Sequence, residues 1–121
     1  MAGERDLSRL LQNLKPKLCP ERYTFTEAAE PILLAGVFAL VREDEGLTSI
    51  QADPRGAWAK ISLEVQSSLE AVGLTGVMAS RLAELGISVN VVAELNHDHL
   101  FVPWDRRDEA LAALQSLERT Q

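Results

Sequence analysis

The chain has 121 residues, a formal net charge of −6 and an isoelectric point near 4.9. This length predicts one compact domain or two small interlocked units. The content of 46% hydrophobic and 25% charged residues is typical of a soluble globular protein. Lysine and arginine are scattered along the chain, so we expect no nucleic-acid partner, because nucleic-acid binders usually carry a basic stripe.

Cysteine content and the N-terminal residues bear on the compartment. Cys19 is the only cysteine, so no disulfide can form within the chain, which fits a reducing environment. The first ten residues are charged and lack the apolar region of a signal peptide. The longest apolar run, residues 32–41, is too short for a bilayer, which needs ~20 residues. We therefore expect a cytoplasmic protein with no membrane partner.

The first half of the chain predicts one helix and three strands. Leu7, Leu10, Leu11 and Leu14 lie at helical spacing and form one apolar face, and Pro16 would end this helix. Apolar and alternating runs predict strands at residues 23–26, at 33–42 (covered on both faces) and at 47–52, with a turn at 43–46 and a two-proline connector at 15–22.

The second half follows the strongest break in the chain, Asp-Pro-Arg-Gly at residues 53–56. We take this break as the boundary between an N-terminal unit, residues 1–55, and a C-terminal unit, residues 56–121. The C-terminal unit predicts a strand at 59–65, a helix at 74–85 closed by Gly86, strands at 89–95 and 99–102, and a last helix. This is the split βαβ pattern of ferredoxin-like folds without its final strand. A strand of the first unit could fill the gap, so we expect an α+β fold of two interlocked units.

The loop at residues 67–76 is the leading candidate for a ligand site. It precedes the predicted helix, and a helix start offers unpaired amides and the positive end of the helix dipole, which suit a carboxylate. Gly73 allows close approach of a ligand, and Ser67, Ser68 and Thr75 offer hydroxyl groups. A plainer interpretation is that Thr75 only caps the helix and Gly73 only turns the chain, since such caps are common.

The sequence His97-Asp98-His99 suggests a metal site or a turn. Histidines two apart on a strand point to the same side, and imidazole is a good zinc ligand. Zinc sites need three or four protein ligands, however, and the chain has no further histidine. We therefore favour a tight turn that uses Asn96 and Asp98, and we expect no metal. A third alternative is that Asp98 or His99 contacts a ligand across an interface between units.

Three stretches together resemble a family of small bacterial ACT-domain proteins: residues 45–48 (EGLT), 67–74 (SSLEAVGL) and 97–103 (HDHLFVP). The resemblance covers nearly the whole chain. More remotely, the chain is similar to the regulatory ACT domains of aspartate kinases and to tandem-ACT arginine sensors. The resemblance implies a ferredoxin-like βαββαβ fold, with an antiparallel sheet and helices on one face. It also implies side-by-side pairing of ACT units and amino-acid binding between them.

This resemblance favours a binding site over simple capping at the loop. We expect the carboxylate of a small amino acid on the loop amides and its ammonium group near Glu70 or an acid of the facing unit, with Asn90 as a further amide donor. The predicted ligand-binding residues are Ser67, Ser68, Glu70, Val72, Gly73, Leu74, Thr75, Asn90, Asp98 and His99.

Catalysis has little support in the sequence, which lacks a G-x-S-x-G motif, a P-loop and a recognisable nucleophile with a placed base. We expect a non-catalytic amino-acid sensor without a cofactor, which forms a homodimer, or a pseudo-dimer within one chain, and regulates an enzyme on another chain. Two alternatives stay open. One is a dimerisation module without a ligand, and the other is a small enzyme or metal-binding protein that uses the His97-Asp98-His99 hairpin.

Overall fold

One antiparallel sheet of six strands forms the framework of the protein. The structure is a computed structural model that describes residues 3–119. The strand order in the sheet is β2-β3-β1-β4-β6-β5. In chain order the elements are α1 (Leu7–Gln12), β1 (Pro16–Ala28), β2 (Val37–Glu43), β3 (Gly46–Ala52), β4 (Trp58–Leu63), α2 (Leu74–Glu84), β5 (Asn90–Ala93), β6 (Asp98–Pro103), the short 3-10 helix η1 (Trp104–Arg106) and α3 (Arg107–Arg119).

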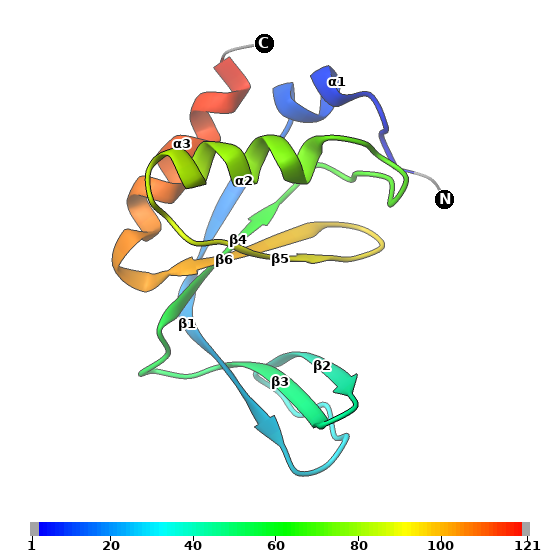
Figure 1. The fold of residues 1–121 in the computed structure, drawn as a ribbon, viewed down its shortest axis with the longest axis vertical. Coiled ribbons are helices and arrows are strands. Elements are labelled where there is room, and N and C mark those ends of the chain that lie inside the picture. The colour runs from blue at the N-terminus through cyan, green and yellow to red at the C-terminus, as the bar shows by residue number, and fades with distance from the viewer. Residues whose placement is uncertain (1–2, 120–121) are drawn as a thin grey trace.

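The C-terminal elements form the ferredoxin-like part of the sheet, and strand β1 completes it. β1 pairs antiparallel with β4, so it takes the place of the final strand that the C-terminal half lacks. Figure 1 shows α1, α2 and α3 gathered on one side of β4, β5 and β6. The predicted α+β, ferredoxin-like fold with helices on one face of an antiparallel sheet is confirmed.

The main core lies between the three helices and this face of the sheet. Strand β4 alternates, and its inward residues Ala59, Ile61 and Leu63 are at most 1% exposed. Helix side chains that pack against them include Leu10, Met78, Leu82 and Leu114, each 0% exposed. Burial of each such side chain is worth ~1.5–3 kcal/mol, so this contact ties the helices to the sheet.

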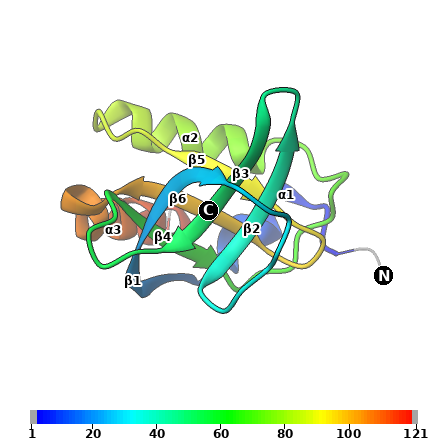
Figure 2. The same ribbon diagram turned by 90° about the horizontal axis from the view of Figure 1, so that it is seen from below.

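The residues 23–52 form an arm made of the second half of β1 with β2 and β3. In Figures 1 and 2 the arm lies at the end opposite the helices and crosses the strands of the main sheet. Phe38 on β2 lies 5.7 Å from Phe101 on β6 between ring centroids, although three strands separate β2 from β6 in the sheet order. Tyr23 and Phe25 also meet Phe101 edge to face. Phe101 is 0% exposed, so it is the hub of a second, aromatic core under the arm.

A bend in β1 directs the arm, and here the predicted connector at residues 15–22 is wrong. β1 already begins at Pro16, and its pairing with β4 shifts register between Leu18 and Arg22. Pro16 stands at the first position of the strand, and Pro20 stands in the register shift. At both places the missing N–H of proline costs no regular ladder bond, so these prolines bend a strand and do not break it.

The predicted strand at residues 33–42, covered on both faces, is also wrong in part. Strand β2 begins only at Val37 and is an edge of the sheet. Leu33 and Leu34 lie in the loop before it and are 68% and 65% exposed. An apolar run does not by itself distinguish a buried strand from an exposed apolar surface. The first part of this run is an exposed loop, and the second part is an edge strand.

Gly56 leads to a prediction about the junction between the arm and β4. A Cβ at Gly56 would lie 2.3 Å from the Tyr23 carbonyl oxygen, in the backbone of β1. We therefore expect Gly56→Ala to lower the free energy of unfolding by about 1–3 kcal/mol, because backbone must move to admit the methyl group. Urea denaturation measures the change.

The control is Gly76→Ala in α2, where the added Cβ meets nothing within 4 Å. There alanine should be neutral or stabilise by about 0.5–1 kcal/mol, because glycine is a poor residue inside a helix. Equal effects of the two substitutions would contradict the steric argument.

Candidate functional site

A small cavity of about 140 Å³ lies where the loop before α2 meets the β5–β6 hairpin. It is lined by Ser67, Ser68, Leu69, Ala71, Gly73, Leu74, Thr75, Gly76, Ala93 and Asp98. This volume is below the ~300–1,000 Å³ of pockets for drug-sized molecules, so the cavity suits a small ligand.

The start of α2 supplies one side of this cavity with backbone amides. Gly73 precedes the helix with φ of +101°, a conformation that glycine adopts easily, and as the N-cap residue it offers no side-chain hydrogen bond to the first-turn amides. The first turn also contains no acidic residue. The positive end of the helix dipole is therefore not neutralised by a side chain of its own first turn.

A buried carboxylate supplies the opposite charge. Asp98, the first residue of β6, is only 6% exposed and accepts a hydrogen bond from the Ser67 hydroxyl at 3.2 Å. Burial raises the pKa of Asp98 above its ordinary value, and the Ser67 hydrogen bond only partly offsets this effect. A cation in the cavity would favour the ionised form of Asp98 again.

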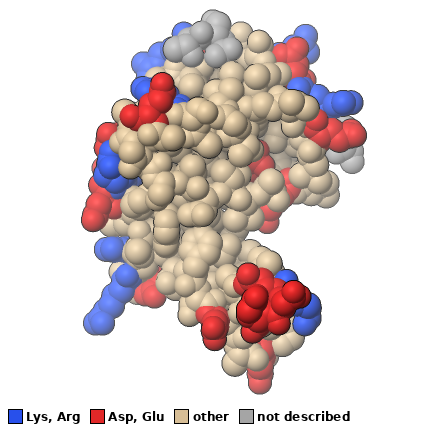
Figure 3. Space-filling model, viewed as in Figure 1, with Lys and Arg blue, Asp and Glu red and all other residues tan. Residues whose placement is uncertain are grey.

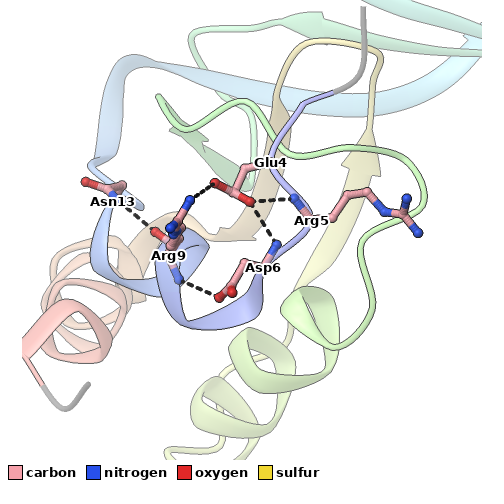
Figure 4. Close-up of polar contacts among 5 residues, drawn as sticks. All are labelled: Glu4, Arg5, Asp6, Arg9 and Asn13. Carbon is pink, nitrogen blue, oxygen red and sulfur yellow. Dashed lines mark hydrogen bonds and ion pairs between the residues drawn. The ribbon is translucent and has the colours of Figure 1, made fainter.

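The N-terminal segment holds the loop in position. Glu4 pairs with the loop through two backbone hydrogen bonds of 2.8 Å, to the Gln66 carbonyl and from the Ser68 amide. Figure 4 shows that the Glu4 carboxylate in turn accepts from the amides of Arg5 and Asp6, while the Asp6 side chain caps α1 by accepting from an amide of its first turn. This support for Ser67 has no motif in the sequence and became visible only in the fold.

The structure brings six of the predicted site residues to the cavity wall: Ser67, Ser68, Gly73, Leu74, Thr75 and Asp98. The other four do not line it. Glu70 is exposed and lies 3.9 Å from Arg5, and Val72 is 82% exposed on the same loop. Asn90 is exposed on the edge strand β5, and His99 points to the opposite face of the sheet from Asp98 because neighbouring strand residues alternate.

Other features of the described chain restrict the kinds of site it offers. Within residues 3–119 no group of three or more His, Cys, Asp or Glu side chains is arranged to hold a metal ion. Over the same residues no helix is long and apolar enough to cross a membrane. Figure 3 shows acidic side chains gathered on the arm, where Glu43 ends β2 and Asp44 and Glu45 form the turn to β3.

Comparisons with known proteins agree with this architecture. Two ACT-domain family models match the chain, over residues 2–68 and 55–116. A crystal structure of a protein of unknown function from Vibrio cholerae, described as a possible transport protein, is 36% identical, with a TM-score of 0.78 over 93% of this chain and 95% of that chain. No curated protein matches the sequence.

Two more distant structures share the fold alone. A protein from Agrobacterium tumefaciens is 20% identical with a TM-score of 0.65, over 88% of this chain and 90% of its own. The ligand-free regulatory subunit of aspartate kinase from Thermus thermophilus is 10% identical with a TM-score of 0.65, over 87% of this chain and 97% of its own. The fold thus places the chain in the class of small α+β domains with a ferredoxin-like sheet. The chain belongs to the ACT-domain family, whose members are in general regulatory ligand-binding modules.

The buried Asp98 leads to a prediction about stability and pH. Because its pKa is raised in the folded state, the folded protein binds this proton more tightly than the unfolded chain does. That stabilisation is present below the unfolded pKa of about 3.9 and is lost as the pH rises through the folded pKa. Asp98→Asn stays neutral and can still accept from Ser67, so it should raise the melting temperature at pH 7.

The rise in melting temperature from Asp98→Asn should shrink as the pH falls, and it should vanish near pH 3, where Asp98 itself is protonated. Asp44→Asn, in the exposed β2–β3 turn, is the control and should change the melting temperature little at either pH. A loss of stability at pH 7 for Asp98→Asn would show that the carboxylate is stabilising, against this prediction.

Proposed function

We propose that this protein is a regulatory module that binds a small amino acid, or a short carboxylate, in the cavity between Ser67 and Asp98. The observation that carries the proposal is the pairing of opposite charges across one small cavity. Uncapped amides at the start of α2 suit an anion, and the buried Asp98 suits a cation. An α-amino acid carries both groups at fixed separation.

In the proposed complex the ligand carboxylate accepts from the amides of Thr75 and Gly76. Its ammonium group donates to Asp98, with the hydroxyls of Ser67 and Ser68 alongside. Asp98 thus takes the role that the sequence suggested for Glu70, because a buried carboxylate gives a stronger charge-assisted bond than an exposed one. The cavity of about 140 Å³ favours small side chains over aromatic ones.

The proposed role at this cavity involves no bond making and needs no cofactor. We propose that the protein acts in the cytoplasm as a homodimer and passes the signal to an enzyme on another chain. We also propose that residues 1–55 and 56–121 are two ACT-like units, in which β1 of the first unit pairs with the sheet of the second.

Binding can be tested with a thermal-shift screen of the twenty amino acids, followed by calorimetry of the best ligand. At a hundredfold excess over its dissociation constant, a ligand should stabilise the protein by about 2.7 kcal/mol. Asp98→Asn should weaken the binding of this amino acid roughly tenfold to a hundredfold, since a hydrogen bond to a charged group is worth ~1.5–3 kcal/mol. The matching acid without the amino group should lose little affinity.

Two further variants separate the parts of this site. Gly73→Val should weaken the binding of amino acids and of simple carboxylates alike. Valine disfavours the φ of +101°, and its Cβ would lie 3.2 Å from a methyl carbon of Leu7. Glu70→Gln is the matched control for Asp98→Asn and should change affinity less. If Glu70→Gln has the larger effect, Glu70 is the ammonium partner. If no amino acid or carboxylate binds, the dimerisation module without ligand becomes the better hypothesis.

Homodimer formation is a separate prediction that exposed apolar side chains support. Phe25, Ile32, Leu33, Leu34 and Val41 are between 37% and 68% exposed, and all lie on the arm. Exposed apolar surface of this kind typically marks an interface. We expect a dimer in sedimentation equilibrium at micromolar concentration, and a monomer for the double variant Leu33→Asp, Leu34→Asp.

The control for this variant is Leu95→Asp, at the tip of the β5–β6 hairpin, where leucine is 69% exposed outside the arm. It should leave the dimer intact if the arm is the interface. A wild-type protein that stays monomeric at these concentrations would contradict the prediction.

A further inference from the structure

A second polar constellation lies on the helix-free face of the sheet, on the side opposite to the cavity. The Ser62 hydroxyl on β4 lies 2.7 Å from Nδ1 of His99 on β6, and Nε2 of His99 lies 2.7 Å from Oε1 of Glu94. Ser62 and His99 face each other in the strand register, and Glu94 follows β5 directly. A hydroxyl, an imidazole and a carboxylate thus form one continuous hydrogen-bonded chain.

The hydrogen bonds determine where the imidazole proton lies. An ionised Glu94 carboxylate can only accept, so Nε2 of His99 carries the proton. Burial lowers the pKa of His99, although Glu94 opposes this effect, so the ring favours its neutral form. Nδ1 then keeps its lone pair, and the Ser62 hydroxyl donates to it. This is the arrangement in which a histidine can take the proton of an attacking hydroxyl.

An aromatic ring of the arm packs beside the hydrogen bonds that join Ser62, His99 and Glu94. Ser62 is half-buried, and the His99 side chain is 13% exposed. The Phe38 ring of the arm packs edge to face on His99 with centroids 4.8 Å apart. Lys60 lies two residues before Ser62 on the same face of β4, with Nζ 4.4 Å from the Phe38 ring centroid.

Lys60 also supplies a positive charge on this face. Among residues 3–119, no carboxylate oxygen lies within 4.0 Å of its ammonium group, so the charge is held by aromatic faces alone. Such a charge can stabilise an oxyanion that develops nearby.

We propose that Ser62 is a nucleophile for acyl transfer from activated esters, with His99 as its base and Glu94 as the positioning residue. Ser62 Oγ forms a bond to the carbonyl carbon while its proton passes to Nδ1 of His99. The tetrahedral adduct then collapses, the bond to the leaving alcohol oxygen breaks, and His99 returns the proton to that oxygen. Water, deprotonated by His99, cleaves the acyl–Ser62 ester in the same way. This activity is independent of ligand binding at the Asp98 cavity.

A fluorophosphonate probe, which phosphonylates activated serines, and p-nitrophenyl acetate test the proposal on the full-length protein. We expect one adduct per chain, mapped to Ser62 by peptide mass spectrometry, and none on Ser62→Ala. His99→Gln should slow labelling at least a hundredfold, in the range of general-base contributions. Glu94→Gln should slow it less, and Glu94→Asp should recover part of the rate, which a purely structural contact would not require.

The matched control is Ser116→Ala in α3. The Ser116 hydroxyl donates to the Ala113 carbonyl and has no histidine partner, so this variant should label like wild type. The proposal is overturned if folded wild-type protein gives no adduct at Ser62, since the hydrogen bonds then only join β4 to β6. It is also overturned if a folded His99→Gln protein labels at the wild-type rate.

Discussion

The pairing of β1 with both β3 and β4 is the constraint on which the rest of this structure depends. The first half of β1 pairs with β4 and so completes the ferredoxin-like part of the sheet under the helices. Its second half carries β3 and β2 into the arm. The register shift between Leu18 and Arg22 lets one strand do both, because a bulge bends a strand and increases its twist.

Strand alternation along β6 divides the polar chemistry of the protein between two faces. Asp98 turns to the helix side and meets Ser67 at the cavity, whereas His99 turns to the other side and meets Ser62. Phe101, two residues further on, is buried under the arm. A single strand of six residues therefore contributes to the candidate ligand site, to the hydrogen bonds that join Ser62, His99 and Glu94, and to the aromatic core. A shift of one residue in the register of β6 would move each of these side chains to the opposite face of the sheet.

Periodicity identified most of the elements, because side-chain spacing follows local backbone geometry. Leu7, Leu10 and Leu11 of α1, the alternating residues of β4 and the glycine after α2 lie where the sequence indicated. Leu14 lies beyond α1, which already ends at Gln12. Prediction failed at Pro16 and Pro20, since only the neighbouring strands show that no ladder bond is lost there. It failed again at Leu33 and Leu34, because an apolar side chain carries no local sign of whether another element covers it.

The sequence by itself determined the fold class, the loop that opens α2 and the amide-rich start of that helix, because each depends on residues close together in the chain. Only the tertiary structure decided which acid faces that loop. Glu70 is near in sequence but exposed, whereas Asp98 comes from a distant strand and is buried against Ser67. The contact of Ser62 with His99 likewise joins two residues that are far apart in the sequence. Such pairings depend on strand register and on the alternation of side chains between faces, which long-range packing establishes.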